Sequence, residues 1–299
     1  MRVMKTRQAT IWVIMLLMLL AICACSPSSQ QIPTLTQLPI SASQAPQQVP
    51  IPVSPAETST AAPPACLTQP GRVEAGKLES TNPAQEYLIY LPPCYDEKTQ
   101  ERYPVLYLLH GQTYTMDQWV RLGAVDVIDN LILSGESAAF IVVFPDDRYW
   151  NLPPGPGFGQ RLVEVLIPYI DGNYRTLRNR DQRAIGGMSR GAGWALRLGL
   201  ARWDLFSSAG LHSLAVLQKD ASKIEDWLAD IPSSSRPRVF MDIGDNDQEL
   251  TMASQVESQL NEYGLSHEWH LYTGAHTEEY WSAHVEEYIQ WYAEGWNNQ

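Results

Sequence analysis

Apolar runs and helical periodicities alternate along residues 66–299. The runs Val105–Leu109 and Phe140–Phe144 are apolar or aromatic throughout, which is typical of strands covered on both faces. Further candidate strands are Glu86–Pro92, Arg183–Gly187, Val239–Ile243 and Glu268–Tyr272. Apolar residues at helical spacing predict helices at Arg161–Asp171, Gly191–Leu200, Lys223–Asp230, Met252–Tyr263 and Glu278–Trp291. This alternation predicts one α/β domain whose mostly parallel sheet is flanked by helices, with sites at the carboxyl ends of the strands.

The first 24 residues have the pattern of a signal peptide. Arg2, Lys5 and Arg7 precede an apolar run at Ile11–Ile22, which is short for a bilayer span. The run ends at Ala24-Cys25, which resembles the lipobox of bacterial lipoproteins. We therefore expect Cys25 to be acylated and to anchor the protein to the cell membrane, outside the cytoplasm. Ordinary secretion after cleavage nearby and a retained anchor helix are the alternatives.

Residues 25–65 are rich in Pro, Ser, Thr, Gln and Ala, and Glu57 is their single charged residue. Such a segment buries too little apolar surface to offset its ordering entropy. We predict a disordered tether between the anchor and the domain.

Composition and charge narrow the class of protein. The 299-residue chain is 44% hydrophobic and carries a formal charge of −12, so a packed domain is expected and nucleic-acid binding is not. Cys66 and Cys94 form an even pair in an oxidising compartment, which predicts a disulfide; two free buried thiols are the alternative. The sequence suggests neither a metal nor an organic cofactor, and it gives no indication of the oligomeric state.

The segment Gly187-Met188-Ser189-Arg190-Gly191 lies between a candidate strand and a candidate helix rich in small residues. That is the context of the G-x-S-x-G nucleophile turn, in which a strained serine projects from the sheet and the flanking glycines allow close approach. Ser189 is the predicted nucleophile. A glycine-rich connecting turn is the alternative.

A serine nucleophile needs a base and an orienting carboxylate, and in this fold both follow it in the chain. His276 comes just after the strand Glu268–Tyr272 and before the last helix, so it is the predicted base. Asp247, three residues beyond Gly244, is the predicted acid, with Asp245 as the alternative. Clustered aspartates also suit calcium, but the spacing lacks the pattern of an EF-hand loop.

Two backbone N–H groups are expected to form an oxyanion hole. One belongs to Arg190, directly after the serine. The other is assigned to Gln112, in the loop His110-Gly111-Gln112 that follows an earlier strand.

The stretches YPVLYLLHG, LIPYIDGNYRT, AIGGMSRGAG, DIGDNDQEL and GAHTEEYW resemble the putative esterase family, which includes esterase D, feruloyl esterases, enterochelin esterases and mycolyltransferases. The resemblance spans most of residues 84–292. It implies an α/β-hydrolase fold with Ser189, Asp247 and His276 as the triad of a serine carboxylic ester hydrolase. Arg190 stands where relatives often have Met.

The substrate is the least determined feature. The resemblance implies a carboxylic ester, and we hypothesise an acyl or feruloyl ester of a carbohydrate. His110, Trp119, Trp150 and Trp281 are candidates for a substrate pocket because they lie in or near loops at the active edge, where aromatic faces stack on sugar or phenolic groups; packing roles are the alternative. Loop 148–159 is a candidate pocket wall, and Arg148 or Arg190 a candidate contact for an anionic group. Acyl transfer with the same triad and a non-catalytic binding lipoprotein are the other functions to consider.

Overall fold

The computed structural model describes residues 65–148 and 157–297. These residues belong to one compact unit of the chain, residues 60–299. The predicted signal peptide, Cys25 and nearly all of the predicted tether lie outside the described residues. Within the described residues, no helix combines the length and the apolar character that crossing a membrane requires.

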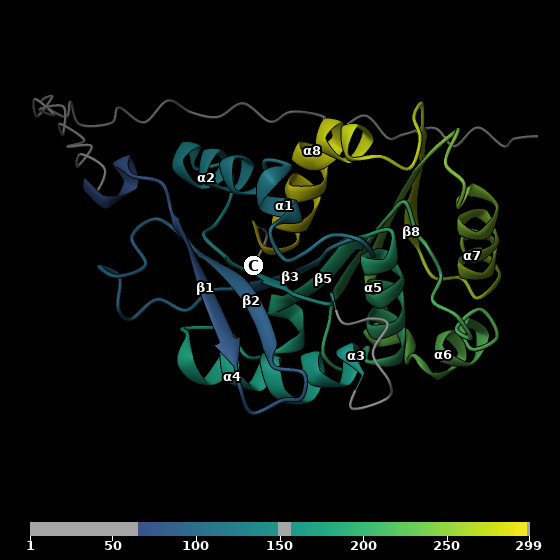
Figure 1. Cartoon of the computed structure of the whole chain (residues 1–299), viewed down its shortest axis with the longest axis horizontal. Helices are drawn as coiled ribbons and strands as arrows, with labels where there is room; N and C mark the ends of the chain where they lie inside the picture. Colours follow the sequence, from purple (N-terminus) through teal and green to yellow (C-terminus); the bar gives the residue numbers. More distant parts are fainter. Residues whose placement is uncertain (1–64, 149–156, 298–299) are drawn as a thin grey trace, which may run out of the picture. The chain divides into compact units, whose positions relative to one another are not determined.

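A single sheet forms the centre of the unit (Figure 1). Its strand order is β1-β2-β4-β3-β5-β6-β7-β8, in which β1, β2 and β4 pair antiparallel and the strands from β4 to β8 pair parallel. The fold is therefore of the predicted α/β class with a mostly parallel sheet. The strands are β1 (Arg72–Leu78), β2 (Gln85–Leu91), β3 (Val105–Leu109), β4 (Ile141–Pro145), β5 (Arg183–Met188), β6 (Ser208–His212), β7 (Arg238–Gly244) and β8 (His267–Tyr272).

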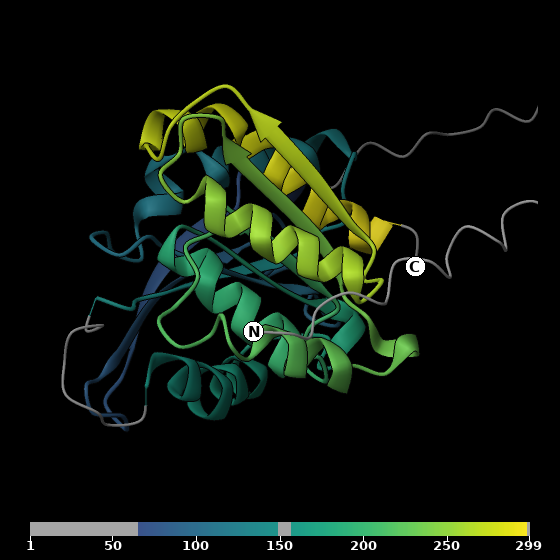
Figure 2. The ribbon, with the colours of Figure 1, turned by 90° about the vertical axis from the view of Figure 1, so that its right-hand side faces the viewer.

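Helices cover both faces of the sheet. The layer with α8 also contains α1 and α2, and Figure 2 shows α8 behind the sheet with α7 in front of it. The helices are α1 (Gln118–Arg121), α2 (Ala124–Ser134), α3 (Phe158–Arg161), α4 (Ile167–Asn173), α5 (Arg190–Ala201), α6 (Ile224–Asp230), α7 (Leu250–Glu262) and α8 (Glu278–Asn297), with a π-helical turn η2 (Leu162–Leu166) between α3 and α4.

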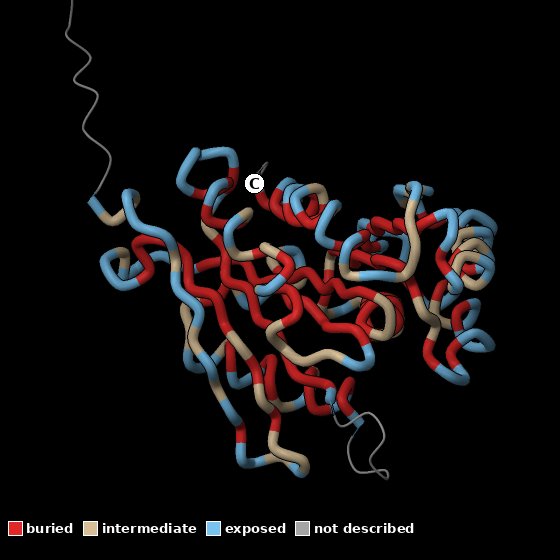
Figure 3. Tube along the Cα trace, turned by 45° about the horizontal axis from the view of Figure 1, so that its top comes forward, coloured by how far each residue is buried: buried red, intermediate tan, exposed pale blue. Residues whose placement is uncertain are grey.

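The two layers explain why the central strands are apolar without alternation. In β3, Val105, Tyr107 and Leu109 face the core under α3 to α7, while Leu106 and Leu108 face the core under α1, α2 and α8. All five residues are at most 2% exposed. The central strands are accordingly buried along their length in Figure 3, whereas the edge strand β1 is largely exposed.

Several elements were not predicted from the sequence, among them strands β1 and β6 and helix α2. Strand β1 (RVEAGKL) carries charged residues because it is an edge strand that is largely exposed. Strand β6 (SAGLH) has few β-formers, and its buried small residues fit beneath neighbouring side chains. Helix α2 is amphipathic and packs on α8.

The predicted disulfide is present. Cys66 lies in the 3-10 turn η1 (Ala65–Thr68), and Cys94 follows β2. The two Cα atoms are 5.0 Å apart, within the usual range for a disulfide. The bond ties the start of the described domain to the end of its second strand.

Candidate active site

Ser189 occupies the turn between β5 and α5. Its φ of 56° and ψ of −121° lie in a region that costs a non-glycine residue about 1–3 kcal/mol. A Cβ on Gly187 would lie 2.4 Å from the carbonyl carbon of Gly191, and a Cβ on Gly191 would lie 2.2 Å from the carbonyl oxygen of Leu109. Glycine is therefore required on both sides of the serine for the turn to close.

The histidine and the aspartate chosen from the sequence meet this serine. The Nε2 atom of His276 lies 2.8 Å from Ser189 Oγ, and its Nδ1 atom lies 2.9 Å from each carboxylate oxygen of Asp247. The carboxylate accepts the proton on Nδ1, which leaves Nε2 free to accept the serine hydroxyl proton. The residues come from the carboxyl ends of β5, β7 and β8, as expected for this type of sheet.

Asp247 is held as an anion. Burial by itself raises the pKa of this carboxyl, but hydrogen bonds from the His276 ring and the Glu249 N–H lower it below its ordinary value. The residue is 5% exposed. A buried, ionised carboxylate fixes the orientation of the ring and stabilises an imidazolium.

The neighbouring aspartates have other partners. Asp245 is exposed and accepts the Gly274 N–H at 3.0 Å. Asp242 is buried and accepts hydrogen bonds within a separate cluster. The three carboxylates therefore have separate partners and do not surround a common position, as calcium ligands would.

The loop after β3 faces the serine. A Cβ on Gly111 would lie 3.8 Å from the Cβ of Ser189. The Gly111 N–H donates to Gln118 Oε1 at 2.8 Å, and its carbonyl lies 2.7 Å from His110 Nδ1. Gln112 follows in this turn, and Arg190 is the first residue of α5, where backbone N–H groups have no intrahelical acceptor.

Three of the four candidate pocket residues are buried, which favours the packing roles given as the alternative. His110, Trp119 and Trp281 are 3%, 1% and 2% exposed, which leaves no surface for a ligand. Trp119 Nε1 donates to the Leu109 carbonyl at 3.0 Å. Trp281 Nε1 donates to Ser213 Oγ, and its ring packs edge-on against His276 at 5.1 Å. Trp150 lies outside the described residues, as does most of loop 148–159.

His110 instead links two loops. Its Nδ1 proton is directed at the Gly111 carbonyl, and its Nε2 accepts the Asp147 N–H at 2.7 Å. The Asp147 carboxylate then accepts from Arg190 Nε at 2.9 Å and from Trp194 Nε1 at 2.7 Å. Burial raises the pKa of Asp147, although the Arg190 charge opposes this. Arg190, proposed as a contact for an anionic group, is thus paired with Asp147, and Arg148 with Asp146 and Glu86.

A second Asp–His pair was missed from the sequence. Asp242 Oδ1 lies 2.7 Å from His212 Nδ1, and Oδ2 accepts from the hydroxyls of Tyr280 and Tyr288 at 2.7 and 2.6 Å. Tyr292 contacts the other ring nitrogen at 3.0 Å. Asp242 and His212 are at most 1% exposed, so this cluster is structural. The only sequence signal for it was Asp242 itself, inside an apolar strand.

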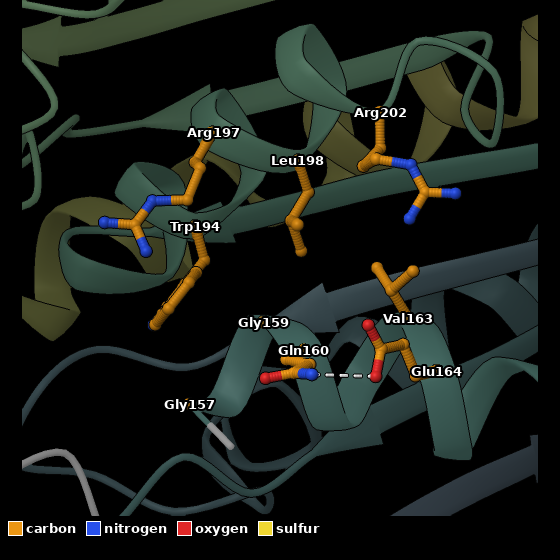
Figure 4. A pocket seen from close by; sticks show the side chains of 9 residues that line it. All are labelled: Gly157, Gly159, Gln160, Val163, Glu164, Trp194, Arg197, Leu198 and Arg202. Carbon is orange, nitrogen blue, oxygen red and sulfur yellow. Dashed lines mark hydrogen bonds between the residues drawn. The ribbon is translucent and has the colours of Figure 1, made fainter. Parts of the chain in front are cut away.

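A cavity of about 280 Å³ lies between α3 and α5 (Figure 4). Trp194 is the lining residue nearest in sequence to Ser189, and its ring is covered by Gly159 and by the Arg197 guanidinium. Ser189, His276 and Asp247 do not line it. The described lining residues are Gly157, Gly159, Gln160, Val163, Glu164, Trp194, Arg197, Leu198 and Arg202.

Comparison with known proteins places this site in context. The model of a family described as putative esterase matches residues 79–291. The endo-1,4-beta-xylanase/feruloyl esterase of Xylanibacter ruminicola is 36% identical over 146 residues, 45% of this chain and 20% of that protein. Esterase Rv1288 of Mycobacterium tuberculosis is 34% identical over 144 residues, 44% of this chain and 30% of that protein. The matched segment thus covers less than a third of either relative.

Solved structures share the fold. A ferulic acid esterase aligns with a TM-score of 0.68 at 24% identity, over 76% of this chain and all of that one. A ferulic acid esterase of Anaeromyces mucronatus, solved with ferulic acid, aligns with a TM-score of 0.63 at 23% identity, over 74% and 90% of the two chains. S-formylglutathione hydrolase of Staphylococcus aureus aligns with a TM-score of 0.57 at 16% identity, over 74% and 97%. These similarities confirm the predicted α/β-hydrolase fold.

Proposed function

Since this chain belongs to the putative esterase family, a family of carboxylic ester hydrolases as predicted, we propose that it hydrolyses esters through an acyl-enzyme on Ser189. One observation carries the proposal: the continuous contacts from Ser189 Oγ to His276, at 2.8 Å, and from His276 to Asp247, at 2.9 Å. A serine hydroxyl is a weak nucleophile by itself. A base with an orienting carboxylate is the arrangement that activates it.

In the proposed acylation step, Ser189 Oγ attacks the ester carbonyl carbon while its proton moves to His276 Nε2. The carbonyl oxygen becomes an oxyanion that accepts hydrogen bonds from the N–H groups of Gln112 and Arg190. When this intermediate collapses, the carbon–oxygen bond to the alcohol breaks, and the imidazolium returns its proton to the departing oxygen. Asp247 stays ionised and stabilises the imidazolium.

Deacylation repeats the sequence with water. Water attacks the acyl carbon as His276 Nε2 takes one of its protons. Collapse breaks the bond to Ser189 Oγ, which recovers its proton from the imidazolium. The acid is released, and the enzyme returns to its starting state without a cofactor.

We propose an acyl or feruloyl ester of a carbohydrate as the substrate. Support comes from the relatives, since one is a xylanase/feruloyl esterase and several solved neighbours are ferulic acid esterases, two of them holding ferulic acid or sinapinate. The Cys66–Cys94 disulfide supports a place in an oxidising compartment. That location agrees with the proposed lipid anchor at Cys25, which would hold the domain at the cell membrane.

Labelling with a fluorophosphonate probe tests the mechanism. We expect the full chain to be labelled and Ser189→Ala to remain unlabelled, whereas labelling of both proteins would contradict the assignment of the nucleophile. A panel of p-nitrophenyl acetate, methyl ferulate and feruloylated xylo-oligosaccharide then tests the substrate class. Refusal of all three esters by a protein that labels at Ser189 would end the substrate proposal and leave the nucleophile intact.

A further inference from the structure

The loop expected to form the oxyanion hole is held by a buried glutamine. Gln118 is the first residue of α1 and has no exposed surface. Its Oε1 accepts the Gly111 N–H at 2.8 Å, and its Nε2 donates to Glu278 Oε1 at 3.2 Å. The two partners fix which end of the amide carries the oxygen.

Glu278 begins α8, two residues after His276. Its Oε1 also accepts a hydrogen bond from Arg121 Nη2 at 3.1 Å, and Arg121 Nε donates to Asp117 Oδ2 at 2.9 Å. The Gln118 side chain therefore joins two segments that are remote in sequence: the loop facing Ser189, and the segment that carries the histidine.

The glutamine binds the His110–Gly111 peptide unit, which directly precedes the unit that carries the proposed oxyanion donor. The Gly111 carbonyl and the Gln112 N–H belong to one planar peptide unit and point in opposite directions. Gln118 fixes the N–H of Gly111. The Gly111 carbonyl is fixed by His110 Nδ1 at 2.7 Å and by the Tyr114 N–H at 3.2 Å. With both backbone groups of Gly111 fixed, the direction of the Gln112 N–H is determined as well.

We propose that Gln118 is a positioning residue for ester hydrolysis, which holds the oxyanion loop in register with the segment bearing His276. This inference rests on the proposed function of the same site. The position demands an acceptor toward Gly111 and a donor toward Glu278, and an amide offers both within one buried side chain. A carboxylate at this position would face the carboxylate of Glu278, and an apolar side chain would leave the Gly111 N–H without its partner.

The test uses Gln118→Met, which keeps the volume and removes both hydrogen bonds. Loss of a whole oxyanion donor lowers kcat by about 10²–10³, so a displaced donor is expected to lower kcat by roughly 10- to 100-fold for p-nitrophenyl acetate, with KM nearly unchanged. An aryl trifluoromethyl ketone, which forms a tetrahedral oxyanion on serine, should lose affinity in parallel, because it depends on the same donors. Rates are expressed per site titrated with a fluorophosphonate, so that loss of folded protein does not count.

A charge-swap pair supplies the rescue. Gln118→Glu keeps an acceptor for Gly111 but opposes Glu278, so we expect kcat to fall. The double variant Gln118→Glu, Glu278→Gln again has one donor and one acceptor at the contact between residues 118 and 278, and its net charge equals that of the parent. We expect it to regain kcat. The matched control is Gln290→Met, which removes an exposed Gln–Glu contact at 3.4 Å on α8 and is expected to leave kcat and inhibitor affinity unchanged.

Two results would overturn the inference. One is a kcat per titrated site in Gln118→Met that stays within about threefold of the parent, a change too small for a displaced donor. The other is a double variant that is no more active than Gln118→Glu. If Gln118→Met yields no titratable serine, the comparison of Gln118→Glu with the double variant decides alone. Failure of the parent protein to label or to hydrolyse any ester would refute the proposed function instead, so the two failures are distinguishable.

Discussion

Replacing Asp247 by Asn removes one negative charge and changes the volume of the side chain very little. In the folded protein both carboxylate oxygens lie 2.9 Å from His276 Nδ1, and Oδ1 also accepts the Glu249 N–H at 2.8 Å. An amide NH₂ facing Nδ1 favours the tautomer whose proton is on Nε2. That nitrogen lies 2.8 Å from Ser189 Oγ and would no longer accept the serine proton.

The expected loss follows from this tautomer change. The same substitution in a serine protease triad lowers kcat by about 10⁴, which corresponds to about 5 kcal/mol of transition-state stabilisation. We expect a loss of that order in Asp247→Asn, measured as kcat on p-nitrophenyl acetate per folded protein. The melting temperature should fall modestly, because Asp247→Asn loses the stabilisation that the lowered carboxyl pKa provides, whereas the amide can keep the hydrogen bond from Glu249.

Asp242→Asn is the matched control, because it alters the other Asp–His pair. Asp242 is buried and accepts from His212, Tyr280 and Tyr288. Hydrogen bonds to a charged group contribute about 1.5–3 kcal/mol, and 1 kcal/mol corresponds to about 2–4 °C in a domain of this size. We therefore expect a melting temperature about 3–12 °C lower, with kcat per folded protein reduced less than tenfold.

The reasoning fails if Asp247→Asn retains more than about a tenth of kcat, since tautomer loss costs far more. It also fails if Asp242→Asn loses as much activity per folded protein as Asp247→Asn. Asp245→Asn should remain within about threefold of the parent, because Asp245 is exposed and its carboxylate accepts from the Gly274 N–H and the Asn246 side-chain amide. A 10⁴-fold loss there would identify Asp245 as the acid.

Four further predictions concern stability. Gly191→Ala should destabilise the domain by about 1–3 kcal/mol or prevent folding, because its Cβ would lie 2.2 Å from the Leu109 carbonyl oxygen. In Gly172→Ala the new Cβ meets nothing within 4 Å, so the free energy of unfolding measured in urea should rise by about 0.4–1 kcal/mol. Replacing both Cys66 and Cys94, which are 28 residues apart, by Ala should cost about 2–4 kcal/mol, and an unchanged melting temperature would contradict this. Because the pKa of Asp247 is lowered in the fold, its ionised form stabilises the folded protein above the ordinary pKa of about 3.9, and this stabilisation is lost as the pH falls through the lower folded pKa. The difference in unfolding free energy between the parent and Asp247→Asn should therefore shrink below about pH 4. A difference that stays constant with pH would contradict this prediction.

The pattern of the sequence determined the fold class because both layers of helices bury the central strands. Val105–Leu109 and Phe140–Phe144 needed apolar side chains on each face, so continuous runs marked them directly. Ser189 was visible for a similar reason, since its strained turn tolerates only glycine at 187 and 191. Local sterics and two-sided burial leave signals within a few residues, and one sequence is enough to detect them.

Tertiary structure alone decided what those signals could not. Strand β6 is held by its neighbours and has little propensity of its own, so Ser208–His212 and the pair His212–Asp242 were missed. Trp119 and Trp281 follow loops at the active edge, yet packing buries them, because sequence position does not determine which way a side chain points. Gln118 contacts Glu278, which is 160 residues away in the sequence. A contact of that range is created only when the chain folds, and no local pattern records it.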